Sequence, residues 1–158
     1  MLERLFEEYH AAVNFVIKEI LTKHITTPSR TIEITQDEFY KRFDPRPEYL
    51  QDVVKTARVE IGRHRRMSKT VRSLRGKRPY FKPGQMILSN PIVSLGEKAL
   101  VLISAKEEEL PIPFDKRSRN RVIDILQKLS RDPKMYGRIR LTWRKAGYAD
   151  IDIRYVRK

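Results

Sequence analysis

The sequence predicts an α+β fold: a helical N-terminal half packed with a partial antiparallel β-barrel that carries one helix. Apolar residues recur at helical spacing through the first half of the 158-residue chain. After residue 76, short apolar runs separated by glycine and proline are typical of strands. Apolar residues make up 40% of the chain, which is enough for a core. We therefore expect a helical lobe at 1–76 and a β-rich lobe at 77–158, or one joint globular unit.

Two helices are predicted at the N-terminus. Apolar residues spaced three and four apart at 2–21 predict a helix of about six turns. Residues 26–29 then break the pattern. Thr35 and Glu38 fit a capping box, so a short helix is expected to run from there to about Phe43. Two prolines in residues 44–47 end it.

A third, long helix is predicted at 50–74, where an apolar stripe has nearly heptad spacing. Its length would be about 36 Å. Gly62 inside this helix costs about 1 kcal/mol relative to alanine, so a bend is allowed there. Gly76 is expected to end the helix. His64 lies on the apolar stripe, where a hydrogen-bonded core histidine is the expected role.

Short strands and one helix are predicted in the second half. The extended pieces are expected at residues 80–84, 86–88, 92–95 and 99–104. The last of them is apolar throughout, which suits a strand covered on both faces. Two prolines confine 110–114 to a sheet edge. Helical spacing predicts one late helix at 121–129.

A β-hairpin is predicted at the C-terminus because apolar and polar residues alternate through 138–144 and 150–155. A two-residue turn would place Trp143 opposite Asp150 and mix the two faces. A three-residue loop at 146–148, or an equivalent bulge, places Trp143 opposite Ile151 instead. We therefore predict the three-residue loop.

Charge is the most informative feature of the composition. The chain has 34 basic and 20 acidic residues, a net charge of +14, and its pI is near 10.2. Residues 55–78 contain ten basic residues and one acidic residue, so this short stretch carries +9 of the total. An ordinary solvated helix face is the simplest alternative. The scarcity of acids and the excess of arginine favour an anionic partner, and nucleic acid above others.

The predicted site therefore combines basic and aromatic residues. Arginine and lysine would contact phosphates, and two rings just downstream would stack on unpaired bases. The phosphate contacts are assigned to Arg58, Arg63, Arg65, Arg66, Lys69, Arg72, Arg75, Lys77 and Arg78, and the stacking to Tyr80 and Phe81. The partner would be RNA or DNA. The alternative is a structural or protein-interaction module whose long basic helix docks an acidic protein.

Other classes of site are not expected. There is no cysteine, and His10, His24 and His64 share no ligand spacing, so neither a metal nor a cofactor is predicted. Cross-strand pairing accounts for Asp150 and Asp152. No catalytic constellation is recognisable, so neither an enzyme nor a small-molecule substrate is predicted. Without an apolar run of membrane-spanning length or a signal peptide, we expect a cytoplasmic protein with no membrane partner.

Four segments, in this order, resemble TnpB (OrfB) proteins of insertion sequences. Residues 9–15 are similar to the start of that family's helical region, and 49–57 to its next long helix. Residues 78–82 resemble the basic-aromatic segment that re-enters the barrel, and 137–155 the closing hairpin before the nuclease. The resemblance implies a family of RNA-guided DNA nucleases, whose wedge-type barrel and helical recognition lobe grip guide RNA and target duplex.

The chain departs from that family at both ends. A RuvC-like nuclease should follow the hairpin, but the sequence ends at Lys158, and the cysteine-rich zinc element is missing. Asp152 does not match the first catalytic aspartate because no glycine-rich continuation follows it. The family's barrel strand before the first helix is also missing, which would expose a barrel edge that a second copy covers in a homodimer. The resemblance thus implies a nuclease-less relative, either a binding factor or a degenerate remnant.

Overall fold

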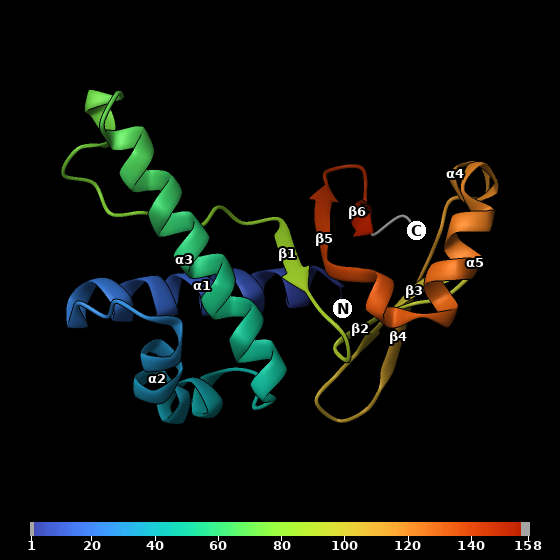
Figure 1. Cartoon of the computed structure of the whole chain (residues 1–158), viewed down its shortest axis with the longest axis horizontal. Coiled ribbons are helices and arrows are strands. Elements are labelled where there is room, and N and C mark those ends of the chain that lie inside the picture. The colour runs from blue at the N-terminus through green and yellow to red at the C-terminus, as the bar shows by residue number, and fades with distance from the viewer. Residues whose placement is uncertain (1, 156–158) are drawn as a thin grey trace. The chain divides into compact units, whose positions relative to one another are not determined.

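The computed structural model describes residues 2–155, and the α+β class is confirmed (Figure 1). The described chain divides into two compact units, residues 2–86 with 142–149 and residues 87–141 with 150–155. Residues 77–86 and the tip of the C-terminal hairpin thus belong with the N-terminal helices. No helix within the described residues is long and apolar enough to cross a membrane.

Three helices build the first unit: α1 (Leu2–Lys23), α2 (Pro28–Arg42) and α3 (Pro47–Ser68). The first predicted helix is confirmed as α1. Its apolar stripe is buried, and α3 packs across it (Figure 1). A buried hydrogen bond of 2.7 Å joins the hydroxyls of Tyr9 and Thr56 between the two helices.

The second helix begins earlier than predicted. Thr27 is the N-cap of α2, and its hydroxyl accepts a hydrogen bond of 3.2 Å from the backbone N–H of Arg30. Pro28 occupies the first turn, where its missing N–H has no cost. Thr35 is not a cap: it is buried inside α2, and its hydroxyl donates to the carbonyl of Thr31. Thr27 and Pro28, which were predicted to break the helical pattern, therefore begin α2.

The long helix ends earlier than predicted. α3 stops at Ser68, and the 3-10 turn η1 (Arg72–Leu74) follows. The last buried residue of α3 is Ile61, so no core packing supports the helix beyond it. The Arg75 guanidinium donates to the carbonyls of Ser68 and Lys69, both at 2.9 Å, and so pairs carbonyls at the helix end. Gly76 then reverses the chain at φ +80°.

The strands form two antiparallel three-stranded sheets, and the described residues contain no closed barrel. One sheet has the order β1 (Gln85–Leu88), β5 (Tyr136–Arg144), β6 (Tyr148–Tyr155); the other has β2 (Val93–Leu95), β3 (Ala99–Ile103), β4 (Glu109–Pro113). The edge position of β4 is confirmed. Pro111 and Pro113 lack the N–H that would extend the ladder, which helps to end this sheet.

Strand β3 is not covered on both faces as predicted. Leu100 and Leu102 are buried, whereas the residues that alternate with them are only half-buried. The strand pairs with β2 on one side and β4 on the other. The central position in its sheet and one covered face therefore explain its apolar run.

The single late helix predicted at 121–129 is two helices, α4 (Lys116–Arg121) and α5 (Ile123–Arg131). Asp115 caps α4 by accepting from the backbone N–H of Ser118 at 3.1 Å. The chain bends at Val122, and α5 buries Leu126 and Leu129. A second 3-10 turn, η2 (Pro133–Met135), leads into β5.

The C-terminal hairpin has the predicted three-residue loop, at 145–147 rather than 146–148. Gly147 adopts φ +90°, which glycine tolerates without strain, and its N–H donates to the Arg144 carbonyl at 3.0 Å. Tyr148 is therefore the first residue of β6.

Candidate nucleic-acid interface

The C-terminal half of α3 carries much of the predicted site and extends beyond the unit core. Figure 1 shows the end of α3 and η1 reaching past α1 and α2. From Gly76 the chain returns toward α1 through residues 76–84, which we term the return segment. Basic residues on α3 and on the return segment thereby face a common region of the first unit, as the cavity described below shows.

A side-chain amide fixes the return segment along α1. The Asn14 Nδ2 donates to the Phe81 carbonyl at 3.0 Å, and the Phe81 N–H donates to Asn14 Oδ1 at 2.9 Å. These two hydrogen bonds engage the N–H and the carbonyl of Phe81 as a neighbouring β-strand would. One residue earlier, the Tyr80 hydroxyl hydrogen-bonds to His10 Nε2 at 2.8 Å. We call the Asn14–Phe81 pair the amide clamp.

The two aromatic residues predicted to stack on bases have different environments. Phe81 is only 4% exposed, and its ring packs edge-on against Tyr9 with centroids 5.9 Å apart. It belongs to the core and presents no ring for stacking, so its predicted role is corrected. Tyr80 is 56% exposed and remains a candidate stacking residue.

Three of the nine predicted phosphate ligands are engaged inside the protein. Arg58 donates to the Thr26 carbonyl at 2.9 Å. Arg63 pairs with Glu60 at 2.7 Å, and Arg75 binds the carbonyls that end α3. The structure thus gives each of these arginines a local structural role.

Six cations remain, and we call them the basic patch. All are exposed, and within residues 2–155 none hydrogen-bonds through its side chain or forms an ion pair; they are Arg65, Arg66, Lys69, Arg72, Lys77 and Arg78. Guanidinium groups bind phosphate oxygens in bidentate geometry. Favourable placement of Arg65 and Arg66 at the α3 C-terminus is worth only about 0.3–1 kcal/mol each. Stabilisation of the α3 C-terminus therefore explains little of the concentration of positive charge in the basic patch.

A cavity of about 450 Å³ lies beside the basic patch, among the end of α1, α3 and the return segment. Arg65, Lys77 and Arg78 line it together with His64, and none of the lining residues is acidic. Leu21 and Ile61 contribute an apolar part of the wall. The cavity is therefore strongly electropositive.

His64 does not have the role expected from its position on the apolar stripe. Its Nε2 is buried and makes no hydrogen bond to any described residue. A buried polar atom without a partner is unusual in a folded protein. Sequence reasoning missed this histidine as a site residue because spacing alone does not show which side chains the return segment approaches.

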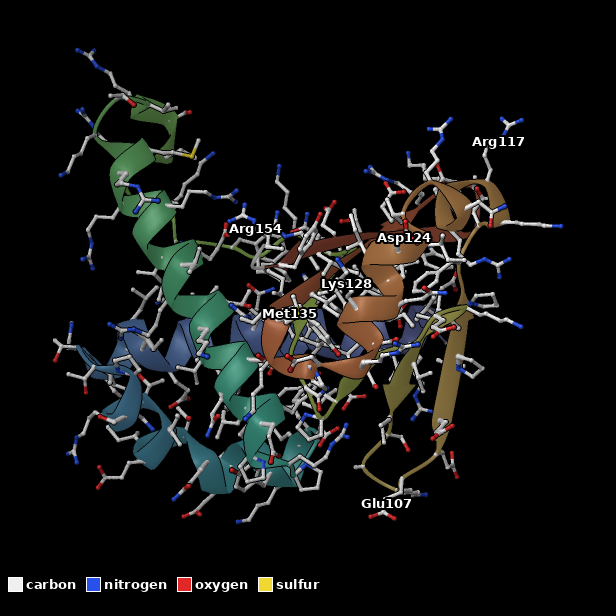
Figure 2. All side chains as sticks on the ribbon, turned by 45° about the vertical axis from the view of Figure 1, so that its right-hand side comes forward. Glu107, Arg117, Asp124, Lys128, Met135 and Arg154 are labelled. Atoms are coloured by element: carbon white, nitrogen blue, oxygen red, sulfur yellow. The ribbon has the colours of Figure 1, made fainter. Side chains whose placement is uncertain are left out.

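A second basic group in the other unit was also missed. α4 has four basic residues among its six, and Lys116, Arg117 and Arg121 are exposed. Figure 2 shows Arg117 pointing away from the ribbon into solvent. The density of basic residues in this segment could have indicated the group. Apolar periodicity does not detect α4, because the helix lacks an apolar stripe.

The described residues contain no group of three or more histidines and carboxylates that could hold a metal ion. No protein-family model, curated protein or solved structure matches the chain. The resemblance to TnpB proteins therefore stays a prediction.

Proposed function

We propose that this chain is a non-enzymatic protein that binds the phosphate backbone of RNA or duplex DNA through the basic patch. The observation that carries the proposal is the set of six exposed cations that have no partner within residues 2–155. No acidic residue occurs between Glu60 and Glu97, and Glu60 is already paired with Arg63. The positive charge of the patch is thus available to an external anion.

Backbone binding of this kind is tolerant of base sequence, because phosphates carry no sequence information directly. Exposed Tyr80 lies on the same return segment as Lys77 and Arg78, so a base beside a bound phosphate has a ring on which to stack. The cytoplasm is the compartment we propose for this activity. We also propose that the chain is a relative of TnpB proteins, and sequencing the RNA that co-purifies with the native protein tests this relationship.

One observation favours the alternative, docking of an acidic protein. Met67 and Val71 are 45% and 40% exposed beside the basic patch, and a protein partner would bury such side chains. Nucleic acid nevertheless fits better, because these exposed apolar residues are few and the six cations of the basic patch have no partner in the described part of the chain.

The test compares two triple variants that remove the same charge. Arg65, Lys69 and Arg72 are changed to alanine in one, and Lys18, Lys41 and Lys55 in the other, all at exposed positions of the first unit. The probes are a fluorescent 20-base-pair duplex and a 20-nucleotide RNA at 50 mM salt. We expect the patch variant to weaken binding by about 2.7 kcal/mol, roughly 100-fold, and the control far less.

Thermal unfolding accompanies the binding data. The patch variant should melt within a few degrees of the natural protein, because its three side chains have no partners in the described structure. Equal losses in both variants, or no binding by the natural protein at 50 mM salt, would contradict the proposal. Unfolding of the patch variant would show that this face is structural.

A further inference from the structure

We propose that the cavity beside the basic patch binds a terminal phosphate monoester of a nucleic-acid strand. This inference rests on the proposed function and narrows it to strands with phosphorylated ends. The patch would hold backbone phosphates along the surface, and the cavity would take the end of the strand.

The volume of the site is large enough for the end of a strand. Its volume of about 450 Å³ lies within the range of about 300–1,000 Å³ typical of ligand pockets. A phosphate inside a continuous backbone has a nucleotide on each side, which hinders its entry into a recess. A terminal phosphate has a nucleotide on one side only and can enter first.

The charges of the cavity favour a monoester over a diester. Arg65 comes from α3, and Lys77 and Arg78 come from the return segment, so three cations line one recess without an acid among them. A phosphate monoester carries a charge of about −1.5 to −2 near neutral pH, whereas a backbone diester carries −1. The same three cations therefore attract a terminal phosphate more strongly.

His64 supplies a polar atom that lacks a partner. The ring lines the cavity, and its buried Nε2 makes no hydrogen bond to the described residues. An imidazole Nε2 that carries a proton donates to a phosphate oxygen. Because Nε2 is itself buried, it would meet a bound phosphate once the ring turned toward the cavity.

The remaining wall suits the nucleotide behind the phosphate. Leu21, Ile61 and Pro79 line the same cavity and offer an apolar surface to a sugar or base. Gly76 also lines it, and apart from its two chain neighbours no atom of the described residues lies within 4 Å of the position where its Cβ would be, which leaves space there. The amide clamp fixes the return segment against α1, so part of the wall is preformed.

The experiment uses three RNA oligonucleotides of one 20-nucleotide sequence, with a 5′-phosphate, a 3′-phosphate or two hydroxyl ends. Fluorescence anisotropy against the full chain is expected to give at least 10-fold tighter binding to one phosphorylated oligonucleotide than to the hydroxyl form. His64→Ala should reduce that ratio to about 2 or less, with the affinity for the hydroxyl form changed less than 2-fold. His64→Gln, which keeps an N–H donor, should retain part of the preference.

Lys77→Ala keeps the test valid if His64→Ala unfolds, because Lys77 is exposed and its side chain has no partner among the described residues. It too should lower the ratio. Equal affinities for the three oligonucleotides, or a preference unchanged in both variants, would overturn the inference. If all three oligonucleotides still bind in a salt-sensitive manner, the proposed function stands without this inference. If none of the oligonucleotides binds, both the proposed function and this inference are contradicted.

Discussion

Glu8 is an ionisable side chain of the first unit whose charged form is disfavoured by its surroundings. Burial raises the pKa of Glu8, and the negative charge of Asp44 raises it further, while Arg4 and Arg46 lower it. Arg46 is already held by Asp44 at 2.7 Å. The folded protein therefore holds the Glu8 proton more tightly than the unfolded chain does, and this contribution to stability is lost as the pH rises above about 4.5.

Glu8→Gln should consequently stabilise the protein at pH 7, by less than about 1 kcal/mol because solvent screens part of the cost. The gain should vanish below pH 4, where the carboxyl is protonated in both states. Urea unfolding followed by Trp143 fluorescence measures it, since the Trp143 ring lies 5.8 Å from Phe6 in this unit. Glu7→Gln removes the same charge at an exposed position and is the control. Destabilisation by Glu8→Gln at pH 7 would contradict this account.

The role of a single residue could be predicted from the sequence where the chemistry of its side chain decides that role. The prediction failed where the role depends on contacts with residues far away in the sequence. The density of basic residues in 55–78 was recognisable by composition. Tyr80 and Phe81 are adjacent aromatics with no local difference in the sequence, yet Asn14, 67 residues away from Phe81, bonds to its backbone as the ring turns into the core. His64 was misjudged for the same reason, since the return segment that approaches it comes from a separate part of the chain.

The return segment is the element on which the candidate site depends most. Asn14→Ala removes both bonds of the amide clamp, which should cost about 1–3 kcal/mol and loosen residues 79–82. We expect the Phe81 amide to exchange with solvent faster and nucleic-acid binding to weaken, because Lys77 and Arg78 lose their fixed position. Hydrogen exchange measured by mass spectrometry reports the first effect and anisotropy the second.

Asn14→Asp is the matched variant, because it keeps an acceptor for the Phe81 N–H and loses the donor to the Phe81 carbonyl. Its exchange rate should lie between those of the natural protein and Asn14→Ala. Unchanged exchange at Phe81 in Asn14→Ala would show that the clamp does not hold the return segment.

Elements defined by apolar periodicity or by proline were predictable. α1, the edge strand β4 and the three-residue hairpin loop are confirmed. Helix ends were harder to predict: α2 begins after its Thr27 cap, and α3 ends at Ser68, beyond its last buried residue, Ile61. α4 lacks an apolar stripe altogether, so periodicity gave no signal for it.

At the scale of the whole molecule, the α+β class followed from the change of pattern after residue 76, but the arrangement of the strands did not. Whether strands close into a barrel depends on pairing between distant segments, which local pattern does not determine. The described strands form two small sheets instead. The homodimer was inferred from a barrel with a missing strand, and it stays a prediction.

Charge distribution links the fold to the proposed function. Residues 55–78 carry +9 of the net +14, and folding neutralises little of it: Glu60 pairs with one arginine, and six cations stay exposed. Like charges held together weaken a fold by self-repulsion unless an anion relieves them. Release of counterions on binding to phosphates should therefore dominate the affinity.

The most direct test of the central claim is the salt dependence of binding to a 20-base-pair duplex between 50 and 300 mM salt. If the six patch residues each contact a phosphate, the logarithm of the association constant should fall against the logarithm of salt concentration with a slope of about −5. A slope near zero would contradict phosphate binding by the basic patch.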